Sequence, residues 1–338
     1  MHWRRWILCL AVVLAGLAIP RSGLAQISAA SWTAGSWTTM ASMPTPRQGL
    51  AAVTGLDGRI YALGGTNNGD GLGTVEAYDP RTNTWSAVAP MPTPRLSLAA
   101  AIGWDGRIYT IGGSPFETGP SLDTVEAYNP RTRTWTALAP LTTARYGLGA
   151  ATGPDGRIYA IGGQLIGQSP PIYFMNSVEA YSPWTNRWTT VAPMPTPRVA
   201  LAAVTGRDGR IYAMGGFQGH SLRTVEVYNP ATNTWTTAAS MPTPRAALAA
   251  ATGPDGRIYA IGGTDDFFHV LNTVEAYNPS TNMWSTVAPM PTARTTLAAA
   301  RAGGRIYAIG GCCHGDYFNQ LSTVEAYTPP GYWSPHYP

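Results

Sequence analysis

The sequence predicts an all-β fold, a six-bladed β-propeller in which each blade is a sheet of four antiparallel strands. First, close copies of the stretch Arg157–Gly163 (Arg-Ile-Tyr-Ala-Ile-Gly-Gly) occur six times, at intervals of 47 to 53 residues. A repeat of this period is typical of one supersecondary unit copied side by side. Second, glycine (38) and proline (29) are abundant and only 12% of residues are charged, which favours short strands and tight turns. Third, no segment after residue 30 shows a sustained apolar period of 3.6 residues, so helices are not expected.

The first half of each unit is predicted to be a β-hairpin. In the first unit, residues 47–54 form a strand of small and apolar residues. Asp57 and Gly58 follow as a two-residue turn, because aspartate and glycine tolerate the positive φ angles of hairpin turns. The second strand, residues 59–63, ends at a glycine pair, where the chain must turn sharply or let another backbone come close.

The second half of each unit follows a loop of variable length. In the first unit the third strand is predicted at residues 74–78 and the fourth at residues 84–88, centred on Trp85. The turn between them, residues 79–83, contains proline and asparagine, which suit a chain reversal. We expect the small first strands to line the centre of the ring and the tryptophan strands to lie outermost, between neighbouring blades.

The repeat residues also predict how the ring closes. The glycine pairs are Gly64 and Gly65, Gly112 and Gly113, Gly162 and Gly163, Gly215 and Gly216, Gly262 and Gly263, and Gly310 and Gly311. The aligned tryptophans are one more in number than the pairs, namely Trp37, Trp85, Trp135, Trp188, Trp235, Trp284 and Trp333. We expect the strand around Trp37 to complete the sixth blade, because the competing strand around Trp333 is short and interrupted by prolines.

The glycine pairs, the tyrosine represented by Tyr78 and the tryptophan that follows it resemble the kelch motif. The resemblance covers residues 37–327 and implies a six-bladed kelch propeller. The predicted domains are a signal peptide at 1–25, the propeller at 26–328 and a proline-rich tail at 329–338. The blades are expected at about 45–90, 91–140, 141–193, 194–240, 241–289 and 290–328, with residues 36–41 as the outer strand of the last.

The N-terminal residues predict export. Arg4 and Arg5 precede a mostly apolar run at residues 6–19, and a small-residue end follows at Ala25, which is typical of a cleaved secretory signal. The alternative is an uncleaved anchor, but the run is shorter than the ~20 residues that a membrane span needs. Removal of three arginines would lower the net charge from +4 to +1 (19 minus 18), which gives no support to nucleic-acid binding. We therefore expect a secreted or envelope protein, monomeric and without a transmembrane span.

Ionisable groups that the repeat does not explain gather in the loops between the second and third strands. Antiparallel strand order places all six of these loops at one end of the ring, which we call the loop face. The candidate ligand-binding residues there are Tyr173, Phe174, His220, Asp265, Asp266, Phe267, Phe268, His269, His314, Asp316, Tyr317 and Phe318. Exposed aromatic side chains beside polar groups are common at binding surfaces. The alternative is that polar residues simply collect in loops while the aromatic side chains fold back onto the blades.

Six arginines open the first strands at the same face, at positions 47, 95, 145, 198, 245 and 294. Such a ring could recognise carboxylates or phosphates. Their strict recurrence instead favours a structural role, because a ligand rarely needs six equivalent contacts. We expect each arginine either to cap loop carbonyls or to pair with a third-strand glutamate, of which there are also six: Glu76, Glu126, Glu179, Glu226, Glu275 and Glu325.

The sequence favours an exported binding module that recognises a protein or glycan through the loop face, with no catalytic residue and no cofactor. The family resemblance also leaves open a secreted metal-dependent oxidase or carbohydrate-active enzyme, since kelch-like propellers include copper oxidases and sugar epimerases. His269, His314, Asp265 and Asp316 with Cys312 or Cys313 could hold a metal, but no tight histidine spacing appears. The adjacent cysteines leave free thiols, a strained disulfide and an intermolecular link open. A purely structural envelope protein is a third possibility.

Overall fold

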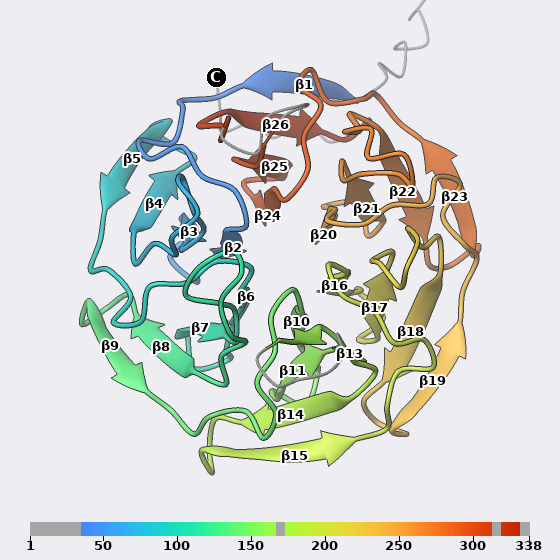
Figure 1. The fold of residues 1–338 in the computed structure, drawn as a ribbon. Helices are drawn as coiled ribbons and strands as arrows, with labels where there is room; N and C mark the ends of the chain where they lie inside the picture. The colour runs from blue at the N-terminus through green and yellow to red at the C-terminus, as the bar shows by residue number, and fades with distance from the viewer. Residues whose placement is uncertain (1–34, 167–172, 313–318, 332–338) are drawn as a thin grey trace, which may run out of the picture. The chain divides into compact units, whose positions relative to one another are not determined.

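The computed structural model describes residues 35–166, 173–312 and 319–331, and within these ranges every regular element is a β-strand. Six four-stranded antiparallel sheets surround a common centre (Figure 1). The predicted six-bladed propeller is therefore confirmed. All described residues belong to one compact unit, Thr33–Pro338. In the part of the chain that is described, no helix is long and apolar enough to cross a membrane.

Every blade has its strands in the order predicted from the repeat, from the centre outwards. The innermost strands are β2 (Ala51–Thr54), β6 (Ala99–Ile102), β10 (Gly149–Thr152), β16 (Ala202–Thr205), β20 (Ala249–Thr252) and β24 (Ala298–Ala302). The second strands are β3 (Ile60–Leu63), β7 (Ile108–Ile111), β11 (Ile158–Ile161), β17 (Ile211–Met214), β21 (Ile258–Ile261) and β25 (Arg305–Ile309). The third strands are β4 (Val75–Asp79), β8 (Val125–Asn129), β14 (Val178–Ser182), β18 (Val225–Asn229), β22 (Val274–Asn278) and β26 (Val324–Thr328). The outermost strands are β5 (Thr84–Ala87), β9 (Thr134–Ala137), β15 (Arg187–Val191), β19 (Thr234–Thr237), β23 (Met283–Thr286) and β1 (Ser36–Thr39).

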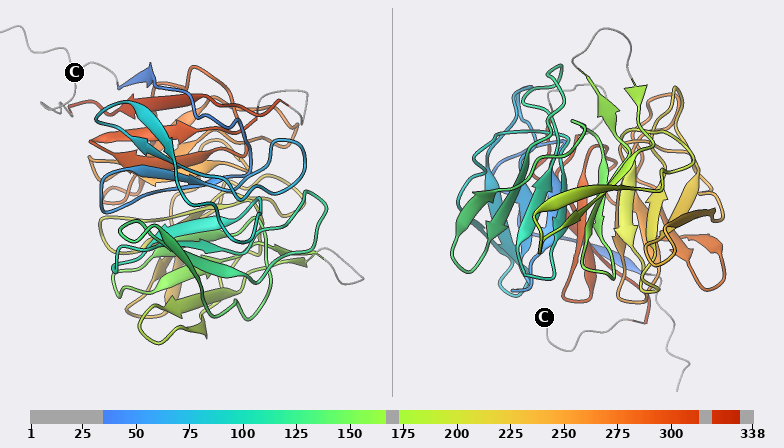
Figure 2. Two further views of the ribbon diagram at one scale, coloured as in Figure 1. Left: turned by 90° about the vertical axis from the view of Figure 1, so that its left-hand side faces the viewer. Right: turned by 90° about the horizontal axis from the view of Figure 1, so that it is seen from below.

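The innermost strands are shorter than the sequence predicts. The strand expected at residues 47–54 begins only at Ala51. Gly49 has a φ of +61°, which interrupts the extended backbone, so Arg47 lies ahead of the strand rather than in it. A further hairpin, β12 (Gln164–Leu165) with β13 (Tyr173–Phe174), was not predicted and extends from one face of the ring (Figure 2).

The hydrophobic core lies between neighbouring blades. All four residues of β3 are completely buried, because the second strand is covered on both faces by adjacent sheets. Its Tyr61 packs against Tyr128 of the next blade with ring centroids 6.0 Å apart, and the same contact recurs at every blade interface. The indole Nε1 of Trp85 donates to the carbonyl of Ala41 at 2.9 Å, in the link from the preceding blade. The predicted place of the tryptophans, between blades, is confirmed.

The two ends of the described propeller meet in the sixth blade. Strand β1 pairs antiparallel with β26, so that Trp37 lies opposite Tyr327 (Figure 1). The indole of Trp37 donates to the carbonyl of Ala288 at 2.8 Å, as its counterparts do in the other blades. The predicted closure by the strand around Trp37 is confirmed, while Trp333 lies outside the described residues.

Candidate functional site

At each glycine pair the chain leaves the second strand and enters a loop of the loop face. Gly64 and Gly65 have φ angles of +61° and +95°, which favour glycine. A Cβ atom on Gly64 would lie 2.5 Å from the carbonyl oxygen of Arg95, and one on Gly65 would lie 2.7 Å from that of Gln48. Both the backbone angle and the space around it therefore require glycine, and the loop starts directly after the pair.

The other five glycine pairs repeat this geometry. The first glycine of each pair has a φ between +59° and +61°, and the second has a φ between +95° and +103°. They are Gly112 and Gly113, Gly162 and Gly163, Gly215 and Gly216, Gly262 and Gly263, and Gly310 and Gly311. A Cβ atom on any of these ten would come within 3.0 Å of a backbone carbonyl oxygen of a neighbouring loop. The pairs are thus part of the scaffold, and the loops that follow them are free to differ.

The six arginines at the loop face are engaged inside the protein. Arg47 is fully buried, and its Nη2 lies 2.8 Å from Oε2 of Glu76. The other five pairs, formed as predicted, have N–O distances of 2.5 to 3.0 Å. Burial lowers the pKa of Arg47 to about 10, although the charge of Glu76 opposes the change, so the guanidinium stays charged at neutral pH. These arginines hold the scaffold together and are not open to a ligand.

A ring of backbone hydrogen bonds forms the floor of the loop face. It consists of the residues two positions after each arginine, which we call the αL ring: Gly49, Ser97, Gly147, Ala200, Ala247 and Thr296. Each amide donates to the carbonyl of the equivalent residue in the preceding blade, at 2.7 to 2.9 Å, and Gly49 closes the circle by donating to Thr296. All six have φ between +50° and +61°. The ring lines a cavity of about 140 Å³ together with six leucines and links all six blades at their centre.

Loops of neighbouring blades are joined by hydrogen bonds at the loop face. Ser121 of the second blade donates through its backbone amide to the carbonyl of Ile166 at 3.1 Å and through its hydroxyl to that of Gln164 at 3.0 Å. In the same way the backbone amide of Ser221 donates to the carboxylate of Asp266 in the next blade. These contacts make the described loops a connected surface, which reduces the entropy lost when a ligand binds.

Among the described residues of this face, the fifth-blade loop presents the most exposed aromatic side chains. Phe267 is 78% exposed and Phe268 is 68% exposed. Asp265 supports them from below, since its Oδ1 accepts from the amides of Phe267 and His269 at 2.9 Å and its Oδ2 lies 3.0 Å from Nδ1 of His269. Hydrogen bonds from His269 and the loop amides outweigh the slight burial of Asp265 and lower its pKa. The carboxylate therefore organises the loop that displays both phenylalanines.

The other predicted residues divide into three groups. Phe174 packs edge-on against Phe217, with centroids 5.9 Å apart, so it meets the neighbouring blade and is only partly exposed. His220 is exposed, and Tyr173 takes part in β13 through its backbone. His314, Asp316, Tyr317 and Phe318 lie outside the described residues, as does Cys313. Among the described residues no group of three or more histidine, cysteine, aspartate or glutamate side chains is placed to hold a metal ion. The metal-site alternative also involves His314, Asp316 and Cys313, which lie outside the described residues, so it stays a prediction.

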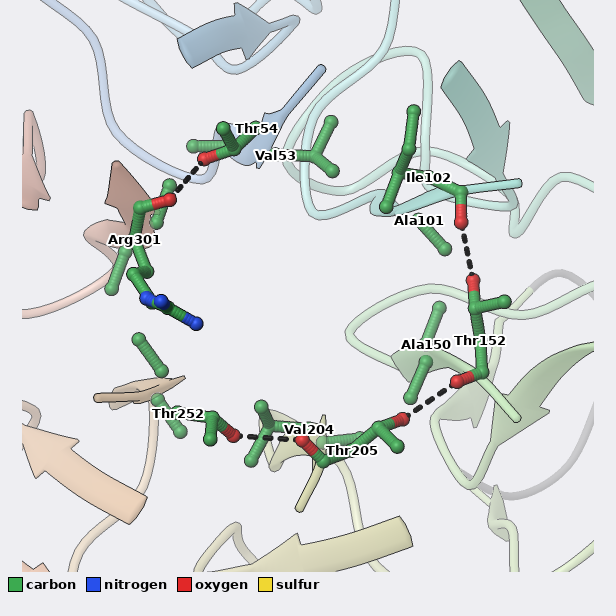
Figure 3. Close-up of a pocket in the computed structure, with 17 residues that line it drawn as sticks. Val53, Thr54, Ala101, Ile102, Ala150, Thr152, Val204, Thr205, Thr252 and Arg301 are labelled. Atoms are coloured by element: carbon green, nitrogen blue, oxygen red, sulfur yellow. Dashed lines mark hydrogen bonds between the residues drawn. The ribbon is translucent and has the colours of Figure 1, made fainter. Parts of the chain in front are cut away.

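At the opposite end, which we call the turn face, the ring opens into a second cavity of about 320 Å³ (Figure 3). Threonine hydroxyls connect its walls: Thr205 donates to the carbonyl of Thr152 and Thr252 to that of Thr205, both at 2.8 Å. Arg301 occupies the equivalent position in the sixth blade and extends its guanidinium into the opening. It is the one charged side chain among the residues that line this cavity.

Several aromatic side chains outside the predicted set also lie on the two faces. Phe116 and Phe217 lie in loops of the loop face, and Trp104 and Trp184 are 61% and 68% exposed on the turn face. The predicted set includes aromatic residues of the third, fifth and sixth loops, but not the aromatic residues that depart from the repeat elsewhere. Trp104 stands where other units have leucine, proline or arginine, and Trp184 where they have arginine, alanine, serine or proline. These two departures from the repeat can be read from the sequence alone.

Comparisons with known proteins agree on the fold. The model of the Kelch motif matches five segments, residues 49–92, 95–142, 145–195, 198–242 and 245–291. Among solved structures, "Structure of YjhT" superposes with a TM-score of 0.70 at 16% identity, covering 84% of this chain and 95% of that one. At this identity the likeness shows the fold alone. No curated protein matches the sequence.

Proposed function

This chain belongs to the kelch-repeat family, and from that premise we propose that it is a binding module that holds a protein partner on its loop face. Kelch propellers generally act as protein-interaction modules. The observation that carries the proposal is the exposed pair Phe267 and Phe268, held on a loop that Asp265 and Asp266 fix in place. Large apolar side chains presented beside polar groups are the usual anchors of a protein interface.

The arrangement suits a preformed site. Phe268 has a φ of +60°, a backbone angle that a bulky residue adopts only when its surroundings impose it. In this loop its amide donates to the carbonyl of Asp265 at 3.1 Å, and the ring of Phe267 lies 5.9 Å from that of His269. A partner would meet a loop whose backbone is already held by hydrogen bonds, so less conformational entropy would be lost on binding.

Export is part of the proposal. It is supported by Arg4, Arg5 and the apolar run at residues 6–19, which lie outside the described residues. A glycan ligand on the loop face and a metal-dependent oxidase or carbohydrate-active enzyme are the other functions that the sequence leaves open. No contact among the described residues favours either of them over a protein partner.

The proposal is tested by affinity capture from envelope and culture fractions of the source cells, quantified by mass spectrometry. The bait is the mature chain, and the test variant changes Phe267, Phe268 and His269 to alanine. Leu56→Ala is the matched control, because Leu56 is 70% exposed and lies on the turn face. We expect a protein captured by the wild type and the control to be depleted at least about 10-fold with the triple variant. A partner that the triple variant captures equally well would place the interface elsewhere.

A further inference from the structure

Two exposed tryptophans and an arginine enclose a cavity on the turn face, far along the strands from the loops discussed above. The cavity has a volume of about 210 Å³ and is lined by Trp104, Asp105 and Arg107 of the second blade and by Gly156, Pro183 and Trp184 of the third. Volumes of about 300 Å³ and more are usual for sites that hold drug-sized ligands, so this one suits a group of about one ring.

The repeat explains how the indole of Trp104 reaches the next blade. In three other units, the residue before the turn aspartate contacts the turn glycine of the following blade. These residues are Leu56, Pro154 and Arg207. Leu56, for example, would lie 3.1 Å from a Cβ atom on Gly106. Trp104 does the same at Gly156, at 3.1 Å. Among Gly58, Gly106, Gly156, Gly209 and Gly256, only Gly156 also has a second side chain close by, since Cη2 of Trp184 would lie 2.4 Å from the same Cβ. Gly156 is consequently buried, although Gly58 in the first blade is exposed.

The cavity offers both a hydrogen-bond acceptor and hydrogen-bond donors. The carboxylate of Asp105 accepts from Nε of Arg107 at 2.6 Å, from the Arg107 amide at 3.1 Å and from the hydroxyl of Tyr109 at 2.6 Å, and its side chain is 33% exposed. The Nη1 and Nη2 atoms of Arg107 have no hydrogen bond to another described residue. The side chain of Arg107 is 26% exposed, so these N–H groups are open to a ligand that carries oxygen acceptors.

From these contacts we propose that the cavity is a saccharide-binding site that holds one hexose ring. A hexose combines an apolar C–H face, which packs on an aromatic ring, with a rim of hydroxyl oxygens that accept from arginine. Two indoles at 61% and 68% exposure supply the aromatic surfaces, and Arg107 supplies the donors. The neighbouring aspartate balances the charge of Arg107, so neutral sugars are the expected class. An extended peptide would need a long groove, whereas this cavity of about 210 Å³ is lined by only six residues.

The test is isothermal titration of the mature chain with hexaoses of glucose, mannose and N-acetylglucosamine. We expect at least one to bind, and the affinity to fall at least about 10-fold in Trp104→Ala and in Trp184→Ala. Leu56→Ala and Arg131→Ala are the controls, because these residues hold the same repeat positions in other blades. The loop-face triple variant should bind sugar as the wild type does, which separates this proposal from the protein-binding function.

Two results would overturn the proposal. One is that no oligosaccharide binds, or that binding persists unchanged in both tryptophan variants. The other is that a proline decamer binds with the same dependence on Trp104 and Trp184 while the sugars do not, which would assign the cavity to proline-rich peptides. Thermal melts of every variant accompany the titrations. Both tryptophans are exposed, so their removal should leave the melting temperature close to that of the wild type.

Discussion

Arginine serves two different structural purposes in this chain. At the turn face, arginines such as Arg59 pair with hairpin aspartates in partly exposed ion pairs, which contribute little to stability. At the loop face each buried arginine satisfies several groups at once. Arg198 donates to Glu226 at 2.7 Å and to the carbonyls of Thr224 and Gly215 at 3.0 and 3.2 Å. The planar guanidinium fork can reach these separate acceptors together, which the single ammonium of lysine cannot do.

Replacing Arg198 with methionine should be strongly destabilising. The change leaves Glu226 buried without its cation, a loss that costs about 3–5 kcal/mol when one partner of a buried pair is removed. Adding Glu226→Gln should restore part of the stability, because the buried charge is then gone. Urea unfolding of the single and double variants measures the change in the free energy of unfolding. Arg187→Met is the control, because Arg187 is an exposed arginine in β15. Equal instability of the single and double variants would show that the unpaired charge is not the cause.

The first strand of each blade depends on the backbone turn that precedes it. The αL ring places one residue per blade at positive φ, and only two of its six members are glycine. Alanine, serine and threonine hold this angle at the other four positions although it costs them roughly 1–2 kcal/mol each. The six hydrogen bonds of the closed ring offset that strain, and the turn they fix directs each arginine towards its glutamate.

Ala247→Gly should therefore leave stability unchanged or raise it by up to about 1 kcal/mol. Glycine removes the backbone strain at a φ of +51°. The stability gained in this way equals or exceeds the stability lost because glycine raises the conformational entropy of the unfolded chain. The same substitution at Ala250, within β20, should lower stability by about 0.5–1 kcal/mol, because glycine weakens a strand. Thermal and denaturant unfolding of the two variants shows whether each substitution raises or lowers the free energy of unfolding. A clear loss of stability in Ala247→Gly would contradict the strain argument.

The propeller holds together because its first and last described strands share a blade. Besides the ladder between β1 and β26, Tyr78 of the first blade packs against Tyr307 of the sixth with centroids 5.6 Å apart. Met43, in the link that follows β1, is 1% exposed and belongs to the core between these two blades. The seam between the ends is thus built from the same contacts as the other five interfaces.

A chain that begins at Pro44 should melt at least about 10 °C below one that begins at Gly35. The shorter chain lacks β1 and the buried side chain of Met43, whose loss alone is worth about 2–5 kcal/mol. Each kcal/mol shifts the melting temperature of a large domain by about 2–4 °C. Calorimetry of the two chains tests this, with the chain from Gly35 as the control for truncation itself. Similar melting temperatures would mean that the ring does not depend on β1.

Part of the candidate site at the loop face could be predicted from the sequence. Asp265, Phe267, Phe268 and His269 were predicted from their place after a glycine pair, and the structure brings them together because they share one short loop. Asp266 also belongs to that loop, but its contact with Ser221 crosses to the next blade. No sequence pattern relates positions on different blades that are not repeat equivalents, so such contacts could not be predicted.

The sequence by itself determined the number of blades, the order of their strands, the partners of the six buried arginines and the closing role of Trp37. It could do so because each of these follows from a pattern copied six times, in which every unit must satisfy the same hydrogen bonds. Only the tertiary structure revealed the αL ring and the cavity between Trp104 and Trp184. Both arise where neighbouring blades meet, and the distance between two blades depends on how their sheets pack rather than on the local order of residues.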